Sequence, residues 1–183
     1  MSSKMALVVM FQNVLAFLFL STFLHKTLNY REHIRIMNAY HLVPARFIVP
    51  SFIGFAATEL TIGLSLLLSG ITVYHVVSIG SLLSIYTFAI GFNLMRGHRH
   101  IHCGCGGILE NDQLNWGLVL RNLLLGFSVV GIWKSHSWYT GEIAFIHKLE
   151  LLMLSLILFS LLYLFKELFN IKKKLVHLMK MFI

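Results

Sequence analysis

Residues 47–95 read FIVPSFIGFAATELTIGLSLLLSGITVYHVVSIGSLLSIYTFAIGFNLM, and the only formally charged side chain in this run is Glu59. Gly70 divides the run into two apolar segments of similar length. A helix needs about 20 apolar residues to cross the hydrocarbon core of a bilayer. The run therefore predicts two membrane-spanning helices, at about 47–69 and 71–95, joined by a very short turn.

Three further apolar segments, at about 5–24, 116–133 and 149–169, extend this pattern along the chain. The 183 residues are 57% hydrophobic and 12% charged, with a mean hydropathy of +0.79, whereas about a quarter of the residues of a soluble domain are charged. The first segment lacks the small-residue cleavage pattern of a secretion signal, so we expect it to be retained. The sequence thus predicts an all-α, polytopic transmembrane helix bundle, with residues 1–183 forming a single domain.

The segment between the first two spans, residues 25–46, has the pattern of an amphipathic helix. Its apolar side chains recur at helical spacing, at Tyr30, Ile34, Met37 and Tyr40. Charged side chains fall on the other faces, and Pro44 would end the helix. We expect a helix that lies in the membrane interface with its apolar face toward the lipid. A solvated helical connection between the two spans fits the same pattern.

The formal net charge of +8 favours a lipid bilayer as the partner and not nucleic acid, because the basic residues stand beside apolar runs. With five spans, one side of the membrane carries Lys4, Lys134 and Lys148, and most of the other lysines and arginines fall on the opposite side. Loops rich in lysine and arginine favour the cytoplasmic side. By this criterion alone, the loop at residues 96–115 would be cytoplasmic.

The loop at residues 96–115, RGHRHIHCGCGGILENDQLN, contains both cysteines of the chain. Cys103 and Cys105 are separated by one glycine, a spacing near the upper limit of Cα separation for a disulfide. Strained, exposed disulfides are the ones that exchange readily. The glycines would leave the sulfurs open to a docking partner, and Arg96 and Arg99 would favour the attacking thiolate. We therefore predict a redox-active pair, with two incidental thiols as the alternative.

His98, His100 and His102 alternate directly before the two cysteines, which places five potential metal ligands in one short segment. Imidazole and thiolate together suit zinc or copper(I). The spacing matches none of the usual structural zinc patterns. The histidines therefore leave two interpretations open, a metal-binding membrane assembly factor and a polar loop at the level of the lipid headgroups.

Two ionisable residues, Glu59 and Arg121, lie within apolar spans. Such residues are costly in a bilayer, so they usually pair, face the bundle interior or line a functional cavity. A Glu59–Arg121 pair between the second and fourth spans would satisfy both groups, with Asn122, Asn93 and Gln12 as further polar partners. The pair could serve structure alone. Glu59 could also couple protons in a transporter, an alternative weakened by the lack of an inverted repeat.

Three short motifs in order resemble the pattern of the methylamine-utilisation MauE proteins, which belong to a wider DoxX-like group of redox-associated membrane proteins. The motifs are Asn93-Leu94-Met95-Arg96-Gly97, Cys103-Gly104-Cys105-Gly106-Gly107 and Leu120-Arg121-Asn122. The resemblance implies a core of about four transmembrane helices, to which the C-terminal span adds a fifth. It also implies that Cys103 and Cys105 are the catalytic redox pair. Supporting roles would fall to Arg96, Arg121, Asn122, Asn93 and Glu59.

The resemblance further implies thiol–disulfide oxidoreductase chemistry or disulfide maturation, together with a thioredoxin-like exported partner and a disulfide-containing client. Quinone-linked members of the wider group suggest a membrane quinone as the final electron acceptor. Disulfide formation needs an oxidising compartment, so this interpretation places the cysteine loop on the extracytoplasmic face of the cell membrane, against the charge criterion. The chain departs from the family pattern at Gly106, where many members have an aromatic residue, and in its histidine-rich approach to the cysteines.

Overall fold

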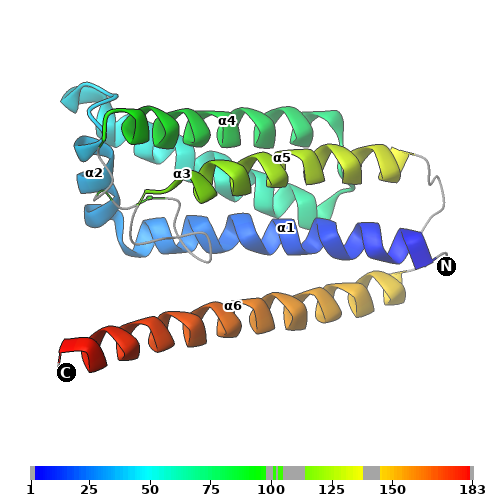
Figure 1. Cartoon of the computed structure of the whole chain (residues 1–183). Coiled ribbons are helices and arrows are strands. Elements are labelled where there is room, and N and C mark those ends of the chain that lie inside the picture. The colour runs from blue at the N-terminus through cyan, green and yellow to red at the C-terminus, as the bar shows by residue number, and fades with distance from the viewer. Residues whose placement is uncertain (1–2, 98–100, 102, 105–113, 138–144, 182–183) are drawn as a thin grey trace.

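The computed structural model of the chain describes residues 3–97, 101, 103–104, 114–137 and 145–181, which form six α-helices and no strand (Figure 1). In chain order the helices are α1 (Ser3–Leu28), α2 (Tyr30–Ala39), α3 (Ala45–Leu68), α4 (Val73–Met95), α5 (Trp116–Ser137) and α6 (Phe145–Met181). All except α2 are long and apolar enough to cross a membrane. The predicted all-α bundle with five spans is therefore confirmed.

Four helices, α1, α3, α4 and α5, surround a common apolar core. The core is formed mainly by Ala16 and Phe19 of α1, Leu66 of α3, Ile79 of α4 and Val129 of α5. Gly63 of α3 packs against α1, and an added Cβ there would lie 2.7 Å from Cγ of Leu20. A larger residue at this position would therefore have to displace the Leu20 side chain or the helix that carries it.

Helix α6 lies outside this core and packs along α1 (Figure 1). Phe159 of α6 meets Phe17 of α1 with 5.8 Å between ring centroids, and Leu151 and Ser155 are buried. Most of the remaining described side chains of α6 are exposed and apolar, as suits a helix surrounded by lipid. The expected arrangement, in which a fifth C-terminal span is added to a four-helix core, matches the structure.

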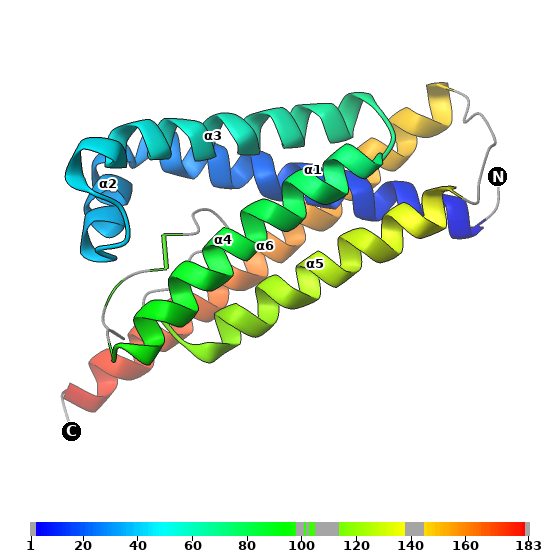
Figure 2. The same cartoon turned by 90° about the horizontal axis from the view of Figure 1, so that it is seen from above.

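Helices α3 and α4 start from a short connection and diverge toward the opposite end of the bundle (Figure 2). The connection is tied to α1 by Gln12, whose Nε2 donates to the carbonyl oxygens of Leu66 and Ser69 at 2.6 and 2.8 Å. At the other end, α2 turns across the bundle, roughly perpendicular to α1 (Figure 1). The space between the diverging helices is therefore bordered by α2.

The predicted amphipathic helix exists as α2. The side chains that it turns toward the bundle are His33, Ile36 and Tyr40, whereas Tyr30 of the predicted lipid-facing stripe is 46% exposed. Placement of α2 in the membrane interface remains a prediction.

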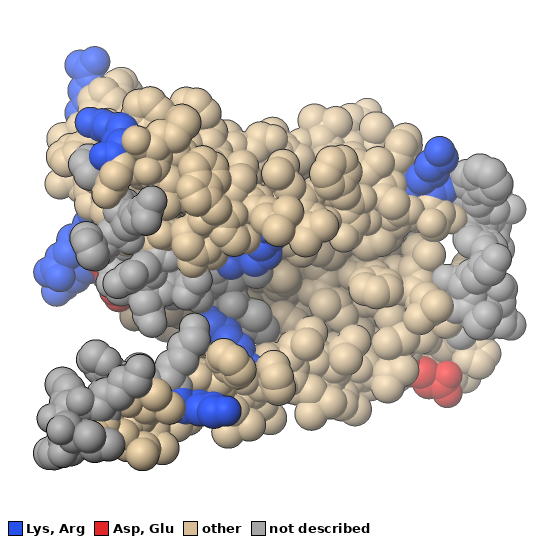
Figure 3. Space-filling model, in the orientation of Figure 1, with Lys and Arg blue, Asp and Glu red and all other residues tan. Residues whose placement is uncertain are grey.

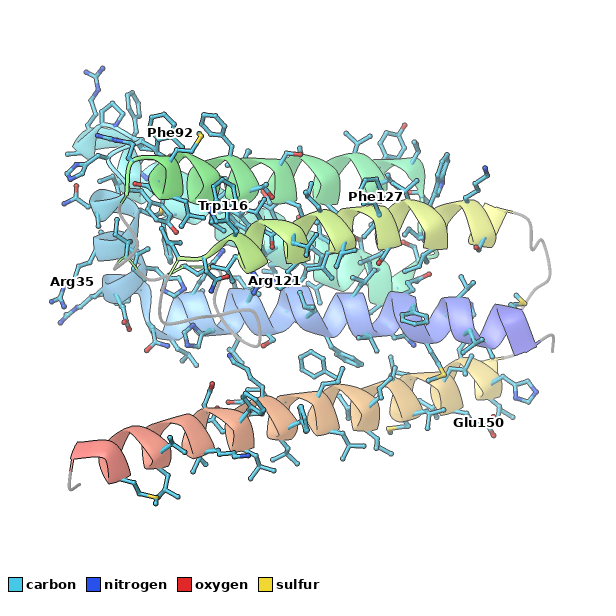
Figure 4. The ribbon with its side chains drawn as sticks, in the orientation of Figure 1. Arg35, Phe92, Trp116, Arg121, Phe127 and Glu150 are labelled. Carbon is cyan, nitrogen blue, oxygen red and sulfur yellow. The ribbon has the colours of Figure 1, made fainter. Side chains whose placement is uncertain are left out.

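The basic residues gather at the end of the molecule that carries α2 and the C-terminus (Figure 3). Arg35 extends away from the bundle at this end (Figure 4). Lys26, in contrast, is only 4% exposed and forms an ion pair inside the bundle. It therefore does not belong among the loop cations, and the side of the membrane on which this end lies stays a prediction.

Candidate functional site

Cys103 is anchored where α2 meets the diverging helices. It belongs to a second apolar cluster with Ile36 of α2 and Ile90 and Leu94 of α4. The Tyr40 hydroxyl donates a hydrogen bond of 2.8 Å to the carbonyl oxygen of Cys103. Residue 103 is thus fixed by side chains from two helices that are distant in the sequence.

Gly104 is required by the backbone at this point. Its φ of +64° lies in the left-handed region, which favours glycine. An added Cβ would also lie 2.9 Å from Cγ2 of Ile36. The glycine between the two cysteines therefore lets the chain turn tightly against α2.

Cys103 takes part in a disulfide and is 4% exposed. The expectation that the glycines leave both sulfurs open to a docking partner is therefore wrong for Cys103, because α2 and α4 cover it. Cys105, the other cysteine of the chain, lies outside the described residues. The redox activity of the pair remains a prediction.

A cavity of about 250 Å³ lies between α2, α3 and α4, and Cys103 forms part of its wall. Most of the lining is apolar, with Phe52 and Phe55 on α3 and Phe88 on α4. Phe88 is 65% exposed on the outer surface of a candidate span. The cavity therefore reaches the surface of the bundle that lipid would cover.

His33 is a polar group in the wall of this cavity. It is 3% exposed, and neither of its ring nitrogens has a hydrogen-bond partner among the described residues. Burial, helped by the positive charge of Lys26 and by His25, lowers the pKa of His33 to about 4. At neutral pH the imidazole is therefore uncharged, with one N–H donor and one acceptor nitrogen.

Lys26, Glu59 and Tyr86 form a buried polar cluster beside the same cavity. The Lys26 ammonium lies 2.5 Å from Oε1 of Glu59 and donates to the Tyr86 hydroxyl at 2.7 Å. The Tyr86 hydroxyl in turn donates to Oε1 of Glu59 at 2.7 Å. The cluster joins α1, α3 and α4, and Lys26 and Tyr86 line the cavity.

The expected direct pair between Glu59 and Arg121 is wrong, because Lys26 occupies that position. Arg121 instead donates from a guanidinium nitrogen to Oδ1 of the neighbouring Asn122 at 3.2 Å. Asn122 and Glu59 do meet at a second cavity of about 20 Å³. Oε2 of Glu59 and Nδ2 of Asn122 lack hydrogen-bond partners among the described residues, and the volume matches one bridging water molecule.

Two other predicted supporting residues lie at the C-terminal end of α4, Asn93 in its last turn and Arg96 directly after its last residue. Arg96 is exposed, and its guanidinium carbon lies over the ring of Phe92, 5.3 Å from the ring centroid. Asn93 is fully buried and donates to the carbonyl oxygen of Ala89 at 3.0 Å. Both lie where α4 ends and the chain continues toward the cysteine segment, and their functional roles stay predictions.

The potential metal ligands His98, His100 and His102 lie outside the described residues. Within the part of the chain that the structure describes, no three histidine, cysteine, aspartate or glutamate side chains are grouped as metal ligands. Zinc or copper binding by the histidine-rich loop therefore remains a prediction.

Sequence reasoning missed three residues of this site, Lys26, His33 and Tyr86. Lys26 was placed in a loop because the first apolar run ends before it, whereas α1 continues to Leu28. His33 fell between the apolar residues chosen for the amphipathic stripe. A helical projection centred on Ile36 would have placed His33 and Tyr40 on the same face.

Comparison with known proteins assigns the chain to a family. The family model of methylamine utilisation protein MauE matches residues 4–134, which contain α2, the cysteine segment and the first four spans up to Lys134. Methylamine utilization protein MauE of Paracoccus denitrificans is 27% identical over 111 residues, covering 61% of this chain and 60% of that relative. No solved structure matches the chain significantly. With this match over most of its length and with its five candidate spans, the chain belongs to the MauE family and is a multi-pass membrane protein.

Proposed function

We propose that this chain is a membrane thiol–disulfide oxidoreductase that serves disulfide maturation, with Cys103 and Cys105 as its redox pair. The observation that carries the proposal is that Cys103 takes part in a disulfide and is held in place by its surroundings. The Tyr40 hydroxyl binds its carbonyl oxygen, and the residue forms part of the wall of a cavity. A cysteine with an incidental role would not need this support. The family assignment, a membrane protein of methylamine utilisation, agrees with an accessory role of this kind.

The two cysteines have different roles in this proposal. Cys103 is covered by α2 and α4, so an attacking thiolate from a partner would react at Cys105 and release the Cys103 thiolate. The partner's second thiolate then attacks the mixed disulfide. The partner loses two electrons and two protons and gains a disulfide, while the pair in this chain becomes a dithiol.

The partner would be a thioredoxin-like exported protein that passes the disulfide to a client. Such an exchange needs an oxidising compartment, so the end of the bundle that carries α2 would face the extracytoplasmic side of the cell membrane. The basic residues at this end would then contact lipid headgroups on that side.

The test uses a thioredoxin-fold protein with one active-site cysteine, activated as a mixed disulfide with thionitrobenzoate. A Cys103→Ser variant retains Cys105 and should release thionitrobenzoate rapidly while forming a covalent complex. A Cys105→Ser variant retains the buried Cys103 and should react at least about tenfold more slowly, because burial hinders attack. A Cys103→Ser/Cys105→Ser variant is the control, and equal rates for all three variants would contradict the proposal.

A further inference from the structure

The cavity beside Cys103 has properties that thiol exchange with a soluble partner does not explain. Its volume of about 250 Å³ exceeds the roughly 150 Å³ at which an apolar cavity holds a benzene ring. It reaches the outer surface of α4 at Phe88, within a candidate span. A ligand of this cavity would therefore arrive from the lipid, and the cavity has room for a substituted ring.

The polar atoms in the wall indicate what that ring must carry. The His33 side chain is only 3% exposed, and neither of its ring nitrogens has a hydrogen-bond partner among the described residues. Buried polar atoms are nearly always hydrogen-bonded in native proteins, so the imidazole calls for a polar atom on the ligand. Lys26 lines the same cavity, and its ammonium is bonded to the Glu59 carboxylate and the Tyr86 hydroxyl, so a buried polar cluster borders any ligand in the cavity.

Cys103 gives the cavity a redox centre at its wall. We propose that this cavity binds the ring of a lipid-soluble quinone, with His33 hydrogen-bonded to one carbonyl oxygen and Lys26 facing the ring. This inference rests on the proposed oxidoreductase function and supplies its electron acceptor. A phosphate-bearing nicotinamide cofactor does not suit the apolar walls of this cavity.

The reaction balances without a further reactant. After exchange with the partner, the dithiol that contains Cys103 gives up two electrons and two protons and re-forms its disulfide. The quinone accepts both electrons and both protons, and its two carbonyl groups become hydroxyl groups. His33 contributes one hydrogen bond to the ring, and the Lys26–Glu59 pair borders the site.

The binding test separates ring binding from redox turnover. The Cys103→Ser/Cys105→Ser variant in lipid nanodiscs is photolabelled with an azidoquinone, and the labelled peptides are mapped with and without decylubiquinone as competitor. We expect labelling of peptides from α2 and α4 that decylubiquinone suppresses. An Ala89→Phe substitution, which fills the cavity from α4, should abolish it, whereas Ala57→Phe at an exposed position of α3 should not. Labelling that persists in the Ala89→Phe variant would overturn the proposal.

His33 provides an independent check. Replacing it with leucine should weaken decylubiquinone binding about three- to tenfold, the loss expected for one buried hydrogen bond, and glutamine should restore part of it. Unchanged binding in the His33→Leu variant would refute the assigned contact.

A redox test distinguishes failure of this inference from failure of the proposed function. Protein with both native cysteines in the reduced, dithiol form should reduce decylubiquinone. The Ala89→Phe substitution should stop this reaction but should leave the release of thionitrobenzoate from the activated thioredoxin-fold protein unchanged. If exchange occurs but quinone reduction is unaffected by Ala89→Phe, the cavity assignment fails and the oxidoreductase function stands. If the ring binds but the cysteines do not exchange, the proposed function fails and the cavity remains a quinone site.

Discussion

Glu59→Gln isolates the most consequential interaction inside the bundle. Lys26 and Glu59 are 4% and 1% exposed, and their ammonium and carboxylate lie 2.5 Å apart. At an effective dielectric constant of about 20, the Coulomb attraction across this distance is roughly 7 kcal/mol, most of which offsets desolvation of the two ions. The substitution keeps the shape of the side chain and removes its charge, so the buried Lys26 ammonium loses the carboxylate that lies 2.5 Å away.

We expect Glu59→Gln to lower the free energy of unfolding by about 3–5 kcal/mol, the usual cost of breaking a buried ion pair from one side. Lys26→Met should cost a similar amount, because it leaves the carboxylate buried with only the Tyr86 hydroxyl as partner. The double variant should recover most of the loss, since it contains no buried charge at this point. The coupling free energy would then be about 3 kcal/mol or more.

The measurement is equilibrium unfolding in mixed micelles of dodecylmaltoside and dodecyl sulfate, followed by far-ultraviolet circular dichroism. Lys148→Met, at an exposed position of α6, serves as the matched control and should change stability by less than about 0.5 kcal/mol. We infer that this buried pair fixes the packing of α1 against α3. That idea would be refuted if each single variant lowered the free energy of unfolding by less than about 1 kcal/mol. It would also be refuted if the double variant lowered it by the sum of the two single losses.

Three further predictions concern the region around Cys103. Between about pH 6.5 and pH 4 the unfolded chain binds a proton at His33 that the folded chain excludes, so the free energy of unfolding should fall on acidification by up to about 3 kcal/mol. Unfolding in the same micelles at several pH values should show a shallower fall of this free energy for His33→Gln. Identical slopes for the two proteins would contradict this prediction. Gly104→Ala, which forces a positive φ and a contact with Ile36, should destabilise the fold by about 1–3 kcal/mol in the same assay, and Ile36→Ala should offset part of that loss in the double variant. Tyr40→Phe removes the hydrogen bond to the Cys103 carbonyl, so dithiothreitol should reduce the disulfide several-fold faster, whereas an unchanged rate would show that this bond does not hold the segment.

The five spans could be predicted because the thickness of a bilayer fixes the length of any helix that crosses it. The cysteine segment could be located because its two cysteines and its glycines stand out in an apolar chain. The cavity could not be predicted, because it depends on the divergence of α3 and α4 and on the position of α2. Neither appears as a local sequence pattern.

Two particular residues show where local reasoning stopped. Lys26 follows the last strongly apolar residues of the first run, where a lysine normally reaches the headgroups, and only tertiary structure shows that it turns inward to Glu59. Arg121 lies within a span, as the sequence predicts, but its guanidinium donates to the adjacent Asn122 and does not pair with Glu59 on α3. Long side chains can reach several neighbours, so pairing within a bundle requires the packing to be known.

The most direct test of the central proposal is labelling of the cysteines with a membrane-impermeant maleimide in intact cells, before and after mild reduction. The account predicts no labelling before reduction and labelling afterwards, because the pair would be oxidised and on the extracytoplasmic side. A Cys103→Ser/Cys105→Ser variant defines the background. Labelling that needs permeabilised cells and no reductant would place reduced thiols in the cytoplasm and would contradict disulfide formation by this protein.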